Sequence, residues 1–91
     1  MALTNDEHTV RIKGSEVTVR GETGLVEATW SLRVDGTEME RKKASGTFDL
    51  HGRLPDGDEV TAQVQQGAFG PTEVAVLHEG EEIVRFKGYV A

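Results

Sequence analysis

Residues 24–40 read GLVEATWSLRVDGTEME and contain the clearest strand and turn pattern of this chain. Apolar side chains recur at every second position from 26 to 34, and polar ones fill the gaps. Because successive strand side chains point to opposite faces, this pattern predicts one long strand with an apolar face and a polar face. Asp35-Gly36 then supplies the positive-φ residues of a tight turn, and the chain returns through residues 37–40. We interpret the other segments as strands that pack on this hairpin.

The same alternation predicts further strands over residues 8–13, 16–20, 44–50, 59–65, 72–78 and 82–89, which makes eight strands with the two of the hairpin. Residues 37–45 allow a second interpretation, because Thr37-x-x-Glu40 matches a helix capping box. That segment has only Met39 and Ala44 as apolar residues, which gives no packing face at helical spacing. We therefore favour a strand there.

The apolar side of each strand predicts the core. Trp30 shares its parity with Leu32 and Val34, so we expect it inside rather than stacked on a ligand. Phe48 and Leu50 are the expected inward pair of their strand.

Composition limits the class of protein. The 91 residues predict a single β domain over 1–91, with 36% apolar and 29% charged residues. Cysteine is absent, which removes disulfides and cysteine-based metal sites. The start, MALTNDEH, lacks the basic and apolar run of a signal peptide, and no segment has the length of a membrane span, so a cytoplasmic protein is expected. A net charge of −6 argues against nucleic acid or an anionic membrane as a partner.

The two halves of the chain, about 8–45 and 46–91, resemble each other. Residues 9–14 align with 47–52, 16–18 with 59–61, and 35–41 with 79–85, and the last alignment places Trp30 at the position of Val74. One four-strand unit would expose its apolar face, whereas two can bury those faces against each other. We therefore predict an eight-stranded antiparallel β-sandwich, with an internal duplication as its origin; a closed eight-stranded barrel is the alternative.

Catalytic and metal-binding patterns are missing. His51 and His78 could approach each other with Asp49 or Glu79, but no HxH or HExxH spacing occurs and zinc needs three or four ligands. The turn Asp56-Gly57-Asp58-Glu59 lacks the spacing of a calcium loop. No serine lies in a nucleophile motif. The sequence therefore predicts a protein that is not an enzyme, with no metal and no cofactor.

The candidate binding residues are Phe69, Tyr89, His51 and His78. Phe69 sits between glycines in a loop, outside any strand pattern, where it either plugs one end of the sandwich or contacts a partner. Tyr89, near the chain end, leaves the same choice open. The basic run Arg41-Lys42-Lys43 is interpreted as protection of an edge strand against unwanted pairing.

Residues 24–41, with an acid, an aromatic residue, a leucine, an Asp-Gly turn and a basic return strand, resemble the sheet hairpins of the Fas apoptotic inhibitory molecule family, and residues 59–83 add to the likeness. The resemblance implies a small eight-stranded antiparallel β-sandwich and a non-enzymatic protein-interaction module. We therefore expect a binding module whose partner is another protein or a second copy of the chain. The alternative is a small barrel that binds a small molecule in its interior.

Overall fold

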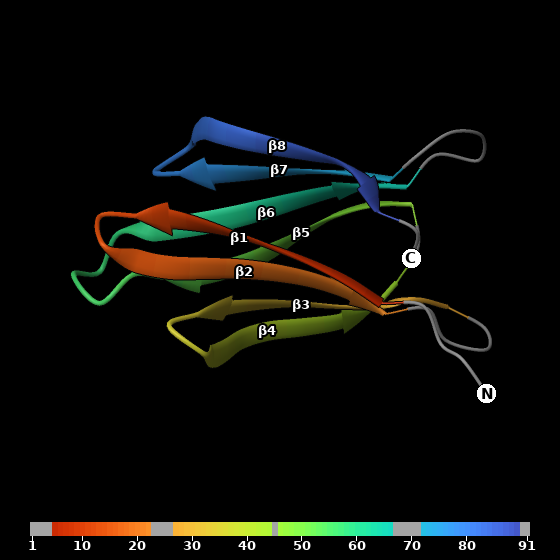
Figure 1. The fold of residues 1–91 in the computed structure, drawn as a ribbon, viewed down its shortest axis with the longest axis horizontal. Coiled ribbons are helices and arrows are strands. Elements are labelled where there is room, and N and C mark those ends of the chain that lie inside the picture. Colours follow the sequence, from red (N-terminus) through yellow and green to blue (C-terminus); the bar gives the residue numbers. More distant parts are fainter. Residues whose placement is uncertain (1–4, 23–26, 45, 67–71, 90–91) are drawn as a thin grey trace.

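The protein is an all-β sandwich of two four-stranded antiparallel sheets (Figure 1). The computed structural model describes residues 5–22, 27–44, 46–66 and 72–89. The first sheet has the order β1-β2-β3-β4 and the second has the order β5-β6-β7-β8. The strands are β1 (Asn5–Ile12), β2 (Ser15–Glu22), β3 (Thr29–Val34), β4 (Thr37–Lys43), β5 (Thr47–Arg53), β6 (Glu59–Gln65), β7 (Thr72–His78) and β8 (Glu81–Tyr89).

The predicted sandwich is confirmed, and the alternative of a closed barrel is wrong, because β4 does not hydrogen-bond to β5 as a ladder and the two sheets stay separate. Residues 37–43 form a strand, so the helical interpretation of this segment is wrong. Residues 27–28 precede β3 without strand geometry, so the described strand is shorter than the alternating pattern that predicted it.

The core lies between the sheets and consists of the side chains that the alternation places inward. Trp30 is fully buried, as predicted, and its ring meets that of Phe48 edge-on at 6.3 Å between centroids. Phe48 itself is half-buried against the core. The buried apolar residues are Ile12, Val17, Val19, Trp30, Leu32, Val34, Leu50, Leu54, Val60, Ala62, Val64, Val74, Ala75 and Val76.

The two sheets are copies of one four-strand unit in their hydrogen bonding. Asp35 donates its backbone N–H to the carbonyl of Glu16 (2.8 Å) and accepts the Glu16 N–H on its carboxylate (2.9 Å). In the second unit, Glu79 donates to the carbonyl of Glu59 (2.9 Å) and accepts the Glu59 N–H (2.6 Å). Both acids occupy the first, positive-φ position of a two-residue turn. The predicted alignment of these two turns therefore matches the structure.

The first block of the predicted alignment is out of register. Val17 and Val60 are equivalent, and their partners in the preceding strands are Val10 and Gly52. Val10 is thus the counterpart of Gly52 rather than of Phe48, and buried Ile12 is the counterpart of buried Leu54. The longer loop before Asp58 allows Leu54 to fold inward, and it donates its N–H to the carbonyl of Asp58 (2.9 Å). The sequence alignment of residues 9–14 with 47–52 matched a shared Thr-apolar-x-apolar pattern and did not detect this shift in register.

Candidate functional site

Two seams join the sheets, one between β4 and β5 and one between β8 and β1, and the repeat makes them equivalent. At the first seam, polar side chains of β4 bind the outward backbone of β5. Glu40 accepts the N–H of His51 (2.6 Å), and the ammonium of Lys42 donates to the carbonyl of Asp49 (2.9 Å). The β5 edge is therefore capped by its neighbour.

The second seam is apolar. The pairings Leu32 with Glu40 and Val76 with Val84 show that Val84 takes the place of Glu40. Phe86 likewise takes the place of Lys42, and its ring stacks on His8 at 4.7 Å between centroids and 15° between planes. Neither an isopropyl group nor a phenyl ring can accept or donate a conventional hydrogen bond, so Val84 and Phe86 cannot cap β1 as Glu40 and Lys42 cap β5.

The turn between β1 and β2 determines which backbone N–H and C=O groups of β1 point away from β2. Lys13 and Gly14 form a two-residue turn with positive φ, so Ile12 and Ser15 are a hydrogen-bonded pair. The alternate residues Glu7, Thr9 and Arg11 therefore direct their N–H and C=O groups away from β2. The hydroxyls of Thr9 and Thr18 lie 2.9 Å apart, as expected for the closer, non-hydrogen-bonded pair. Within the described part of the chain, no group binds these outward backbone atoms.

The other edge strands carry protection that β1 lacks. Met39 in β4 and Ile83 in β8 are the extra residues of equivalent β-bulges. They are also the exposed large apolar side chains of the described residues, at 39% and 42% exposure. Bulges interrupt an edge and hinder pairing with another chain. By contrast, β1 runs in unbroken register with β2 from Asn5 to Ile12, and it contains neither a bulge nor a proline.

The histidines predicted as binding residues do not form one site. His51 is exposed on the outer face of β5, beside a surface groove of about 280 Å³ that Met39, His51, Gly52, Arg53 and Glu59 line. His78 is the last residue of β7, and its Nε2 lies 2.8 Å from a carboxylate oxygen of Asp58. Unlike His51, His8 and His78 are half-buried.

The two remaining predicted residues are not placed. Phe69 lies outside the described residues, and Tyr89 is described only as the end of β8, without its side chain. Among the described residues, no group of three His, Asp or Glu side chains has the arrangement of a metal site.

An ionic cluster ties the sheets together at one end. Lys13, in the β1–β2 turn, binds Asp56 and Asp58 of the β5–β6 loop, with 2.8 Å to Asp58. Hydrogen bonds from Lys13, and for Asp58 also from His78, hold the pKa of each aspartate below its ordinary value. The same contacts raise the pKa of Lys13. The turn that was considered for calcium is thus occupied by a lysine ammonium.

One signal in the sequence accompanies the open edge of β1. Glu7 and Arg11 flank Thr9 at equal distance, which is the pattern of a strand that can pair with itself.

Comparison with known proteins adds no constraint on function: no family model, no curated protein and no solved structure matches the chain. In the described residues, no helix has both the length and the apolar character that a membrane crossing requires.

Proposed function

We propose that this protein is a non-enzymatic interaction module that associates through β1, and that the segment added to β1 is β1 of a second copy. One observation supports the proposal above the others. Side chains of β4 bind the outward N–H of His51 and the outward C=O of Asp49, whereas β8 has Val84 and Phe86 at the positions of the two capping residues, facing the equivalent groups of Thr9 and Glu7 with no hydrogen-bonding side chain. An edge with free donors and acceptors is a template for strand addition.

Charge complementarity favours a second copy. If two β1 strands pair antiparallel about Thr9, the outward-directed residues face one another in register. Glu7 then lies opposite Arg11 of the second copy, and the two-fold symmetry repeats the pair. Both side chains are on the outer face, and Arg11 makes two long contacts on an exposed surface, 3.4 Å to Glu16 and 3.3 Å to the carbonyl of Gly14. Opposite charges across an antiparallel pair contribute about 0.2–1 kcal/mol each.

A charge exchange tests this arrangement by sedimentation equilibrium over a concentration series. Glu7→Arg converts both attractive pairs into repulsive ones, which is expected to weaken association by about 1–3 kcal/mol, or roughly 5- to 100-fold. The double variant Glu7→Arg/Arg11→Glu restores opposite charges and should recover most of that loss. Glu59→Arg, the same charge change on the central strand β6, is the matched control and should leave association unchanged.

Thr9→Pro tests the backbone rather than the charges. Proline is tolerated at an edge position whose N–H faces solvent, so the monomer should fold. The variant removes an outward donor at the centre of the proposed pair and should weaken association by about 1–3 kcal/mol for the two symmetric bonds. A wild-type protein that stays monomeric at millimolar concentration would refute self-association. A double charge variant no better than Glu7→Arg would refute the register.

The alternative, a small molecule bound inside a barrel, has less support, because the two sheets do not close into a barrel. The proposed location is the cytoplasm, which is compatible with a chain that has no cysteine to oxidise.

A further inference from the structure

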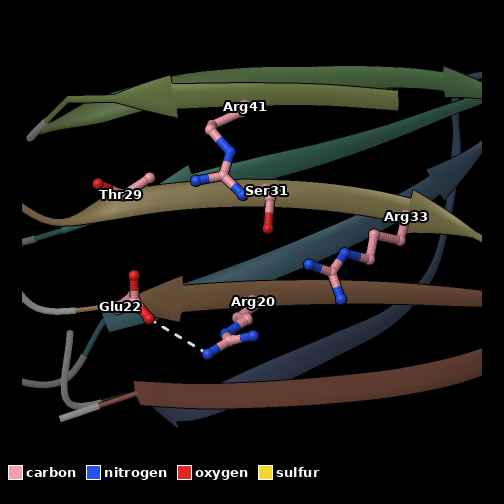
Figure 2. A pocket seen from close by; sticks show the side chains of 6 residues that line it. All are labelled: Arg20, Glu22, Thr29, Ser31, Arg33 and Arg41. Carbon is pink, nitrogen blue, oxygen red and sulfur yellow. Dashed lines mark hydrogen bonds and ion pairs between the residues drawn. The ribbon is translucent and has the colours of Figure 1, made fainter. Parts of the chain in front are cut away.

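A small hollow lies on the outer face of the first sheet, away from the β1 edge. It has a volume of about 60 Å³ and is lined by Arg20, Glu22, Thr29, Ser31, Arg33 and Arg41 (Figure 2). These residues come from β2, β3 and β4. Since a water molecule needs roughly 10–15 Å³ measured in this way, the hollow has room for a small oxyanion.

The hollow exists because a small residue lies among long ones. Ser31 is paired with Arg20 on one side and with Arg41 on the other, and Arg33 follows two residues along β3. Ser31 is only 4% exposed, yet its hydroxyl forms no hydrogen bond with any of the described residues. Figure 2 shows this hydroxyl directed into the space beside the guanidinium groups. The hollow thus offers one hydroxyl and three planar, multidentate donors.

Positive charge exceeds negative charge in the hollow, although the whole chain carries −6. Arg20 lies 3.2 Å from Glu22, and Arg41 lies 2.8 Å from Glu38. Arg33 has no ion pair within the described part of the chain. The pKa of Glu38 is lowered chiefly by the hydrogen bond from Arg41, and the positive charge of Arg33 lowers it further. The site therefore has one uncompensated guanidinium.

The second unit shows that the fold does not require this cluster. The counterpart of Arg41 is Arg85, which pairs with Glu82 at 2.9 Å as Arg41 pairs with Glu38. This pair recurs beside both bulges and is a structural feature. The three other key positions differ, because Gln63, Ala75 and Leu77 stand where the first unit has Arg20, Ser31 and Arg33. The cation-rich hollow is thus an addition to the first unit alone.

We propose that this hollow binds a phosphate dianion, either free phosphate or the terminal phosphate of a monoester. Arginine forks match the oxygens of phosphate in geometry as well as in charge, and the Ser31 hydroxyl can donate one further bond. A phosphate monoester also offers three acceptor oxygens, whereas a carboxylate offers two.

The test is a titration followed by amide and arginine Nε–H NMR shifts, with sodium phosphate and with O-phosphoserine, against sodium chloride at matched ionic strength. Saturable shifts centred on Ser31 and Arg33 are expected for both phosphate ligands and not for chloride. Tighter binding of O-phosphoserine assigns an esterified phosphate, and tighter binding of inorganic phosphate assigns the free ion.

Variants separate a specific site from general screening. Arg33→Gln should weaken phosphate binding at least about fivefold, because a bond to a charged group is lost. Arg33→Lys keeps the charge without the fork and should fall between Arg33→Gln and the wild type. Arg53→Gln removes the same charge from the exposed surface of the second sheet, outside both the hollow and the β1 edge, and is the control. Equal binding by Arg33→Gln and Arg53→Gln, or shifts that chloride reproduces, would overturn the proposal.

Discussion

Gly21→Ala is expected to destabilise the protein, although the residue lies in a strand with ordinary φ. A Cβ at position 21 would lie 2.6 Å and 2.7 Å from two ring carbons of Trp30. Ordinary carbon contacts are about 3.5–4.0 Å, so the ring would have to move by about 1 Å. Trp30 is fully buried between the sheets, and side chains in protein interiors are close-packed. Overpacking of this kind costs about 1–3 kcal/mol, whereas an unstrained Gly→Ala change would stabilise by about 0.4–1 kcal/mol.

Gly52→Ala is the matched control in the other sheet. A Cβ there would lie 3.0 Å from Met39 Cγ and 3.1 Å from Leu32 Cδ2. Met39 is 39% exposed and flexible, so it can move aside, and we expect a loss under about 1 kcal/mol. Urea unfolding followed by circular dichroism, at a protein concentration below association, measures both variants. Equal stability of Gly21→Ala and the wild type would refute the packing of Trp30 over Gly21.

The second sheet supplies a rescue for the same site. Val64 and Val74 form the pair equivalent to Gly21 and Trp30. Gly21→Val and Trp30→Val should each destabilise, the latter by about 3–5 kcal/mol through a cavity. In the double variant the added valine fills part of that cavity, so the loss should be smaller than the sum by about 1–3 kcal/mol. Strict additivity would contradict the equivalence of the two pairs.

Three further predictions concern the sheet contacts. Lys13→Met should raise the pKa of Asp58, which an NMR titration measures, and an unchanged pKa would argue against the ion pair. Because folding lowers this pKa, Asp58 stabilises the folded protein at pH values above its unfolded pKa. That stabilisation is lost as the pH falls through the folded pKa. Glu40→Ala should uncap the N–H of His51 and destabilise by about 1–3 kcal/mol in urea unfolding, with faster exchange of that amide; unchanged exchange would mean that the cap is absent. Leu50→Ala should cost about 2–5 kcal/mol in the same assay, because Leu50 is fully buried, and a loss well under 1 kcal/mol would be incompatible with its place in the core.

Period-two patterning predicted the fold because each strand has one buried and one exposed face. β6 and β7 match their predicted bounds, and Trp30 is in the core because its parity with Leu32 leaves no other place. The pattern could not decide between a sandwich and a barrel, because alternation describes the faces of a strand and not the pairing of its edges. The bulges at Met39 and Ile83 were equally invisible, since an extra residue in an edge strand needs no special letter.

The candidate sites were harder to predict because they depend on neighbours that are distant in sequence. The open edge at β1 results from Val84 and Phe86, which look like ordinary inward residues until their counterparts Glu40 and Lys42 are seen to cap β5. The arginine cluster joins residues of three strands around Ser31, whose neighbours in sequence give no motif. The two histidines that were predicted as binding residues did not mark either candidate site, because His51 and His78 lie in different environments.

Residue-resolved amide hydrogen exchange at two protein concentrations tests most directly whether one edge is open and the other closed. We expect the Thr9 amide to exchange fast in dilute protein and to slow as the concentration rises, while the His51 amide, bound by Glu40, is slow at both concentrations. A Thr9 amide as protected as that of His51 in dilute protein, or one whose exchange does not respond to concentration, would mean that the β1 edge is not open.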